Sequence, residues 1–376
     1  MMKKKTDKSR AGPETAAYYS PFSSWQSIFV RIFELVFDLF TELHLRFFSM
    51  NRKPDRRILG VWDFYMRGGG FGDMMTFVEI LGVLRHRYGL TGERNVDVCF
   101  IDDASHYNAK KPAFRKPITW KRQMMNLAHL SPYLGSVYYF KSDAEFRRFY
   151  TSNRGRYYRW PVSVSLSQPS NVHVVSEFKR KTGRIPGFVL PPETINDVYS
   201  LYEREVFPAM PVIINIRRNT RNTERNTDIA EISRFIRHFE GDREYKFIII
   251  CMKEEIPPEL RKLRNVIFSK DHFSSMEHDL AFIYTSYISM FPSSGMANFA
   301  WFSDVPMINF GRHVNDPYTA PKKGELFSDH QRYFHRVEEA KWLLREFSDL
   351  SEHLKIRKLN NTTLHSHERK EYNYKF

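Results

Sequence analysis

Apolar positions in the second half of the chain form short runs that are separated by stretches of helical periodicity. The runs, which are typical of buried strands, cover residues 212–217, 246–252, 266–269, 287–291 and 306–310. Between them, apolar residues recur at the spacing of one helix face in residues 228–239, 257–263, 277–285 and 295–302. Strands that alternate with helices in this way predict a parallel, doubly wound α/β sheet.

The first half shows a looser version of the same alternation. Apolar runs that predict strands cover residues 58–62, 96–101 and 136–140. A helical pattern runs from about Asp73 to Gly89, residues 107–122 are basic and irregular and predict a long loop, and residues 157–192 give no clear pattern. The two halves together predict an α/β protein with two Rossmann-like domains that meet near residues 208–211.

Residues 22–50 carry an aromatic-rich apolar face beside a stripe that includes Arg31, Glu34, Asp38 and Glu42. Those charges are costly inside a bilayer, so the pattern favours an amphipathic helix that lies on a membrane surface over one that spans it. The same apolar face suits packing on the protein itself or on another subunit, and this alternative stays open. The polar and basic residues that come before the segment do not predict a secretory signal.

Composition and charge narrow the class of protein and of partner. The chain has 376 residues, of which 42% are hydrophobic, and this is enough for two globular cores. Its 58 basic and 43 acidic residues leave a formal charge of +15, which favours phosphorylated sugars, anionic lipids or nucleic acid as partners. Cys99 and Cys251 both lie in apolar runs, so no disulfide framework is predicted and a reducing compartment is the simpler interpretation.

A glycine-rich turn between the first strand and the first helix is one candidate site. Gly69, Gly70 and Gly72 would let a ligand approach the backbone, and the helix start that follows attracts anions. Asp73 comes directly after them and could act as a general base at the lip of a cleft, or could only cap its helix. The glycine spacing does not fit the dinucleotide-binding fingerprint cleanly, which weakens a dehydrogenase interpretation.

Four arginines come at or after the end of the strand predicted at 212–217 and before a helix, namely Arg217, Arg218, Arg221 and Arg225, and Asn226 follows them. Ligands of α/β sheets bind at the carboxyl ends of strands, and the fork of a guanidinium group matches a pyrophosphate. A solvated basic loop is the alternative, although grouped cations repel one another unless an anion offsets them.

A third candidate lies where the strand predicted at 287–291 passes into a helix, at Ser293, Ser294, Gly295 and Met296. Hydroxyl groups and backbone amides at this turn would hold phosphate oxygens, although a serine there could serve only as a helix cap. Two strand ends of one predicted sheet are therefore suited to the same anion.

Gly72-Asp73 at the first helix and Ser294-Gly295-Met296 at a late helix together resemble the heptosyltransferase-type glycosyltransferases of the GT-B class. The resemblance spans roughly residues 58–311 and lies in motifs. It implies an α/β fold of the GT-B type, in which two Rossmann-like domains have parallel sheets that face a central cleft. It also implies that Asp73 takes the proton of the acceptor hydroxyl and that the serine-glycine turn contacts the donor phosphates.

The arginine motif adds a second resemblance and one departure. Arg217 and Arg225-Asn226 resemble the arginine-rich strand end of related bacterial glycosyltransferases and, more distantly, of fucosyltransferases. The lysine that usually follows the donor-domain strand of the heptosyltransferase type is replaced here by arginines, so the donor sugar cannot be inferred from the family.

The resemblance divides the chain into parts with different expected roles. A basic tail and the amphipathic helix occupy residues 1–50, the acceptor-side domain 51–208, and the domain that binds the nucleotide-sugar donor 209–330. Residues 331–376 are expected to form a helix at about 337–354 and then a polar tail.

The implied reaction is displacement at the anomeric carbon of a nucleotide-diphosphate sugar, whose departing pyrophosphate is held by cations and amides. No metal and no cofactor beyond this donor are expected. Asp102 and Asp103 end the second predicted strand and could instead hold manganese or magnesium, but no spaced acid or histidine accompanies them.

We therefore expect a metal-independent, bacterial-type glycosyltransferase that adds a hexosyl, heptosyl or fucosyl group to a cell-surface glycan or glycolipid precursor. Its expected partners are the donor, the acceptor and a membrane contacted through residues 22–50, with the chain cytoplasmic and peripheral on the inner membrane face. Nucleic acid is not expected. A noncatalytic RNA- or membrane-binding protein is the alternative, because aromatic and basic residues interleave in residues 154–160. A GT-B-like transferase of another group, such as pyruvyl, is a third.

Overall fold

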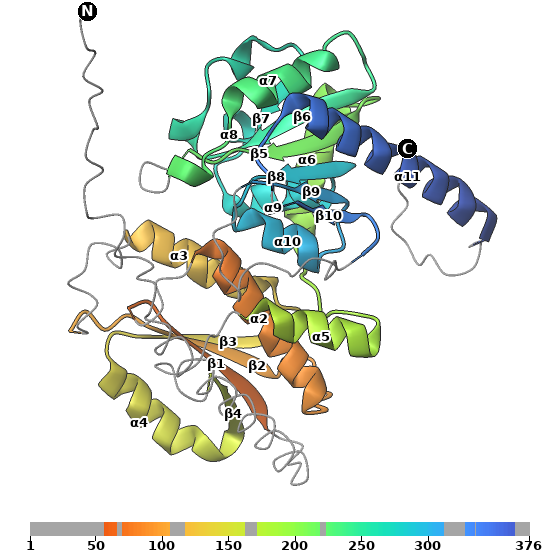
Figure 1. Ribbon diagram of the computed structural model, residues 1–376. Coiled ribbons are helices and arrows are strands. Elements are labelled where there is room, and N and C mark those ends of the chain that lie inside the picture. The colour runs from red at the N-terminus through yellow and green to blue at the C-terminus, as the bar shows by residue number, and fades with distance from the viewer. Residues whose placement is uncertain are drawn as a thin grey trace, which may run out of the picture. The chain divides into compact units, whose positions relative to one another are not determined.

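The computed structural model describes residues 56–65, 70–105, 117–161, 171–218, 223–311, 328–334 and 336–364 (Figure 1). All of them belong to one compact unit, Asp55–Phe376. The amphipathic segment 22–50 lies outside the described residues, so its membrane contact stays a prediction. In the described part of the chain, no helix combines the length and the apolar character that crossing a membrane requires.

The first sheet, as far as it is described, has four parallel strands in the order β3-β2-β1-β4. They are β1 (Arg57–Asp63), β2 (Val96–Ile101), β3 (Leu134–Phe140) and β4 (Tyr157–Trp160). The helices that accompany them are α2 (Phe71–Arg87), α3 (Ile118–Asn126), α4 (Asp143–Asn153) and α5 (Val172–Thr182).

Helices α2 and α4 cover opposite faces of this sheet (Figure 1). On the α2 face, a Cβ at Gly60 would lie 2.5 Å from Leu81 Cδ1, so the absence of a side chain lets the helix approach the strand. On the other face, Leu59 and Cys99 pack against Phe146 of α4 in one buried cluster. Helices therefore cover both faces of the sheet, and functional groups can lie at the ends of its strands.

The second sheet, within the described residues, has six parallel strands in the order β10-β9-β8-β5-β6-β7. They are β5 (Met210–Asn215), β6 (Tyr245–Ile250), β7 (Val266–Phe268), β8 (Ile288–Phe291), β9 (Met307–Asn309) and β10 (Gln331–Tyr333). The helices are α6 (Pro192–Glu205), α7 (Ile229–His238), α8 (Ser269–His272), α9 (Met276–Tyr284), α10 (Met296–Phe302) and α11 (Ala340–Leu364). The predicted α/β class with two parallel sheets is confirmed.

Some local predictions differ from the structure, most of them in the first half. The loop predicted at 107–122 is wrong from Ile118 onward, where α3 begins, and the segment without a clear pattern holds β4 and α5. The helix predicted at 257–263 is only a 3-10 turn over Leu260–Lys262. Helices α3 and α4 of the first half were not predicted because they bury few residues. Helix α3 buries Lys121 and Met124, and α4 buries only Phe146, so neither has the continuous apolar face from which a helix is predicted.

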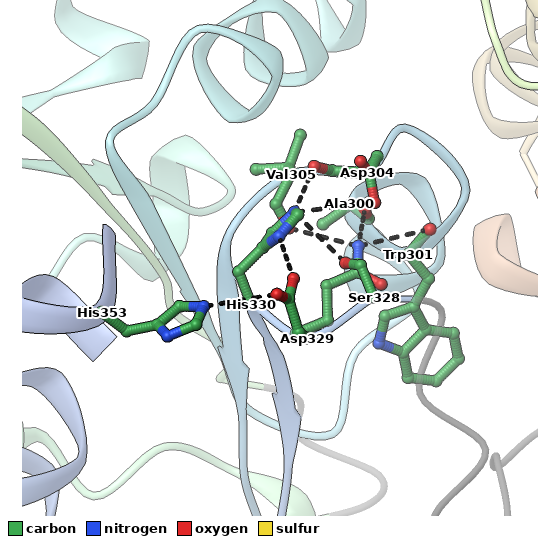
Figure 2. Close-up of polar contacts among 9 residues, drawn as sticks. Ala300, Trp301, Asp304, Val305, Ser328, Asp329, His330 and His353 are labelled. Carbon is green, nitrogen blue, oxygen red and sulfur yellow. Dashed lines mark hydrogen bonds and ion pairs between the residues drawn. The ribbon is translucent and has the colours of Figure 1, made fainter. Parts of the chain in front are cut away.

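His330 fastens three elements of the second half to one another (Figure 2). Its buried ring places Nε2 2.9 Å from the carbonyl oxygen of Asp304 and Nδ1 3.0 Å from Asp329 Oδ1. His353 of α11 lies 3.5 Å from Asp329 Oδ2, and Gln331 Nε2 donates to carbonyl oxygens at the end of α10. These contacts tie β10 to the end of α10 and to α11.

Candidate active site

Arg225 and Ser293 join two strand ends of the second sheet. β5 and β8 are neighbours in the sheet, and the segments that follow their carboxyl ends carry these two residues. The guanidinium group of Arg225 donates from Nε to Ser293 Oγ over 3.1 Å and from Nη2 to the Ser293 carbonyl oxygen over 2.8 Å. Two of the three motifs predicted from the sequence therefore meet at the edge where ligands of α/β sheets bind.

Thr227 closes the loop that carries the arginines. Its hydroxyl accepts the N–H of Arg217 at 3.0 Å, and its own N–H donates to the Arg217 carbonyl oxygen at 2.9 Å. Arg218 is exposed and donates its N–H to Glu255 Oε2 at 3.3 Å, while Asn226 is half-buried in the same loop. Burial raises the pKa of Glu255, although the Arg218 N–H and the nearby guanidinium groups oppose the rise.

Ser294, Gly295 and Met296 form the turn between β8 and α10. Gly295 is the N-cap residue of α10, and no side chain caps the start of this helix. The hydroxyl of Ser294 is buried and makes no hydrogen bond within the described residues. Buried hydroxyl groups ordinarily have a partner, so this one is suited to a ligand oxygen.

The start of α2 rests directly on this turn. A Cβ at Gly72 would lie 2.8 Å from Gly295 Cα, and a Cβ at Gly295 would lie 2.5 Å from the Gly72 nitrogen, so neither position has room for a side chain. Asn298 of α10 donates from Nδ2 to the Gly72 carbonyl oxygen at 3.0 Å and to Thr76 Oγ1 at 2.8 Å. The glycine-rich turn of the first half and the serine-glycine turn of the second half therefore lie against each other.

Asp73 is half-buried in the first turn of α2, one residue after this contact. Its Oδ2 accepts the N–H of Gly70 at 2.6 Å, so the carboxylate caps the helix, which is one of the two roles predicted for it. Its role as a general base stays a prediction. Gly70 leads into α2 with an extended backbone, and Gly69 lies outside the described residues.

Asp102 and Asp103, the alternative metal-binding pair, are engaged by protein groups. Asp102 receives Lys121 Nζ at 2.5 Å and the Tyr139 hydroxyl at 2.5 Å. Burial alone would raise the pKa of Asp102, but these donors outweigh burial and hold it below its usual value. Asp103 accepts the N–H of Asp143 at the start of α4. Across the described residues, no three His, Cys, Asp or Glu side chains are grouped as metal ligands would be.

Glu79 of α2 is a residue that the sequence pattern did not single out. Its side chain is buried, and its Oε1 accepts the N–H of Gly187 at 3.0 Å. Burial raises the pKa of Glu79 to about 8. Phe188 stacks on Phe299 of α10 with ring centroids 5.6 Å apart, so Glu79 fastens to α2 a segment that also contacts α10. Its only signal in the sequence is a charge among the apolar positions of a helix.

The two tyrosines of the basic and aromatic segment 154–160 do not offer a surface on which bases could stack. Tyr157 and Tyr158 are 5% and 6% exposed. Tyr158 stacks on Tyr88 with ring centroids 4.2 Å apart, and the Tyr157 hydroxyl donates to Asp97 Oδ2 at 2.9 Å. Both rings hold β4 to the protein, which weakens the RNA-binding alternative.

The two cysteines are core residues. Cys99 and Cys251 are buried and free. Burial raises the pKa of both thiols, and that of Cys251 reaches about 12. Neither is therefore a thiolate nucleophile at neutral pH.

No protein-family model and no curated protein matches the sequence. Among solved structures, the chain is similar to the ADP-heptose LPS heptosyltransferase II of E. coli, with a TM-score of 0.50 and 10% identity over 80% of this chain and 99% of that one. A family 9 glycosyltransferase of Veillonella parvula gives a TM-score of 0.47 at 12% identity, over 81% and 90% of the two chains. Identities this low relate proteins by fold alone. The chain has the two-sheet GT-B fold of the heptosyltransferase type.

Proposed function

We propose that this protein is a glycosyltransferase that moves a sugar from a nucleotide-diphosphate sugar to an acceptor hydroxyl. The observation that carries the proposal is the contact between Gly72 and Gly295. Gly72 directly precedes Asp73, and Gly295 comes two residues after Ser293, which is the partner of Arg225. This contact supports one site in which Asp73 accepts a proton and the arginines and serines hold a diphosphate. The fold shared with heptosyltransferase II supports the same class of reaction.

In the proposed reaction, the acceptor oxygen bonds to the anomeric carbon while the bond from that carbon to the pyrophosphate breaks. Asp73 takes the proton of the attacking hydroxyl. Negative charge gathers on the departing nucleoside diphosphate, where Arg217, Arg218, Arg225 and the Ser294 hydroxyl stabilise it. Because guanidinium groups supply the positive charge, we propose that the reaction needs neither a metal ion nor a cofactor.

We propose a cell-surface glycan or glycolipid precursor as the acceptor, at the cytoplasmic face of a bacterial membrane. The amphipathic pattern of residues 22–50 supports a membrane surface as the working place. The formal charge of +15 supports an anionic donor. The donor sugar is a hexose, a heptose or fucose.

A donor panel tests the proposal. The protein is mixed with ADP-, GDP- and UDP-linked sugars, and with CMP-linked sugars as the control that lacks a pyrophosphate. A donor that binds only the folded protein raises the melting temperature, so at least one diphosphate donor should do so and the CMP sugars should not. The proposal is wrong if no diphosphate sugar binds, or if CMP sugars bind equally well.

The role of Asp73 is tested by Asp73→Asn, which can still cap α2 but cannot accept the proton. We expect donor binding to persist and release of nucleoside diphosphate in the presence of acceptor to fall about 100- to 10,000-fold. Glu193→Gln is the matched control, because Glu193 is an exposed acidic residue in the first turn of α6. Equal turnover by wild type and Asp73→Asn would remove Asp73 as the base.

A further inference from the structure

The amino ends of the four described strands of the first sheet lie along one edge, because these strands are parallel. A basic or imidazole side chain comes shortly before each strand, namely Arg56 before β1, Arg94 before β2, His129 before β3 and Arg156 before β4. Asp73 follows the carboxyl end of β1 and so belongs to the opposite edge. With seven residues in β1, the two edges are about 20 Å apart.

The contacts of Arg56, just before β1, hold the turn before β4 in place. Its Nε donates to the Gly155 carbonyl oxygen at 3.1 Å, and its guanidinium group lies 4.9 Å from the ring centre of Tyr158. The turn that carries Arg154 and Arg156 is thereby fixed beside the start of β1. Both of these arginines are exposed.

A cavity of about 550 Å³ opens at the same edge, between the starts of β2 and β3. Its polar lining groups are Arg94, His129 and Ser131. Arg57 of β1 reaches across β2 to Gly135 of β3, where a Cβ would overlap its guanidinium group, and it pairs with Asp97 of β2 at 2.5 Å. Arg94 and His129 are exposed at the rim, so the cavity presents hydrogen-bond donors to an incoming anion.

Carboxylates cancel only part of this charge. Asp97 is 1% exposed and is already paired with Arg57, whereas Glu93 is exposed in the turn before β2. The exposed groups of the edge are therefore mainly cationic. We name the edge formed by Arg56, Arg94, His129, Arg154 and Arg156 the basic amino edge.

We propose that the basic amino edge docks on an anionic phospholipid surface and that the cavity beside Arg94 receives a headgroup phosphate. The chain enters β1 at Arg57, so the amphipathic segment 22–50 is joined covalently to the protein at this edge. A lipid surface would engage both features together. The proposal does not depend on the transfer chemistry, and it sets the Asp73 edge about 20 Å from the bilayer, toward the solution.

A lipid surface fits the edge better than nucleic acid does. Single-stranded nucleic acids are held by basic side chains together with aromatic rings on which bases stack. Of the aromatic rings at this edge, Tyr88, Tyr157 and Tyr158 are each less than 10% exposed, and the half-buried ring of Tyr133 has the Arg85 guanidinium group stacked 4.0 Å from its centre. Phosphate groups on a bilayer require only the cationic groups and attract each exposed basic residue separately.

Co-sedimentation of the full-length chain with vesicles tests the proposal. The vesicles contain either phosphatidylcholine alone or phosphatidylcholine with phosphatidylglycerol, at low and at raised salt. The charge-reversed variant carries Arg94→Glu, Arg154→Glu and Arg156→Glu. Its partitioning onto anionic vesicles should fall about tenfold or more relative to wild type, and salt should weaken wild-type binding.

The matched control carries Arg243→Glu, Lys262→Glu and Arg264→Glu, which reverse three exposed cations in the second half. Both variants keep residues 1–55 and change the net charge equally, so the amphipathic segment contributes equally to each. We expect the control to retain most of the wild-type binding. A glutamine version of the first variant, checked by thermal unfolding, separates lost docking from lost folding.

Three outcomes would overturn the proposal. One is equal partitioning of the two charge-reversed variants, and another is equal binding of wild type to neutral and anionic vesicles. The third is a charge-reversed variant that binds vesicles as wild type does but loses affinity for a single-stranded RNA probe.

Discussion

Glu79 makes the stability of the fold depend on pH through a single buried carboxyl group. It is 1% exposed, and burial raises its pKa from 4.5 to about 8. Between these two values the folded chain holds a proton that the unfolded chain has released, so folding takes up a proton. The free energy of unfolding therefore falls as the pH rises through this window, by up to about 1.4 kcal/mol per pH unit.

Replacing Glu79 with glutamine should remove this contribution. Glu79→Gln keeps an oxygen for the Gly187 N–H and cannot ionise. We expect the wild type to lose stability between pH 4.5 and 8 and the variant to lose less, as measured by urea unfolding at several pH values. Glu259→Gln, at an exposed position, should keep the wild-type slope. Identical slopes for wild type and Glu79→Gln would contradict the prediction.

The types of the site residues could be predicted from the sequence, but their partners could not. Arginines after a strand and serines before a helix are local signals, because both depend on position relative to strand ends. The hydrogen bond from Arg225 to Ser293 joins residues 68 positions apart, and that from Asn298 to Gly72 spans 226 positions. Such contacts depend on how the chain folds back on itself, which no local pattern encodes.

At the scale of elements, the strands and helices that are deeply buried could be predicted from the sequence, and the shallowly buried ones could not. Val212, Ile213 and Ile214 of β5 are all fully buried, because helices cover both faces of a parallel sheet, and such strands read as continuous apolar runs. Helix α4 buries only Phe146, so its polar positions hide any period. Helix α5, in the segment without a clear pattern, buries Val172, Val175 and Phe178 on one narrow stripe.

His330 provides a test of how elements are held together in the second half (Figure 2). The ring joins the Asp304 carbonyl oxygen to the Asp329 carboxylate, and it is 4% exposed. His330→Ala leaves both acceptors without this partner and should lower the free energy of unfolding by about 1–3 kcal/mol. His353→Ala removes only the half-exposed outer ring of the cluster and should change stability by less than about 0.5 kcal/mol. Urea unfolding of both variants measures these changes. Equal losses in the free energy of unfolding would mean that the ring of His330 is not the group that holds these elements together.

At the scale of the whole molecule, the first and second sheets are joined where α2 meets α10. The residues that we propose bind the nucleotide-sugar donor follow strands of the second sheet, whereas α2 follows the first strand of the first sheet. Because Gly72 touches Gly295 and accepts from Asn298, an ordered serine-glycine turn also orders the start of α2. A bound nucleoside diphosphate should therefore slow hydrogen exchange in the first turns of α2, although its phosphates contact only the other half.

Gly295→Ala tests this coupling. The new Cβ would lie 2.5 Å from the Gly72 nitrogen, so α2 and α10 must move apart, at a cost of about 1–3 kcal/mol in stability. Arg225 and Ser293 remain, so we expect the nucleoside diphosphate to bind more weakly and, at saturation, to leave hydrogen exchange in α2 nearly unchanged. Gly241→Ala is the matched control, since a Cβ there has no atom within 4 Å. If saturated Gly295→Ala protects α2 as the wild type does, the close contact of these two glycines does not carry the coupling.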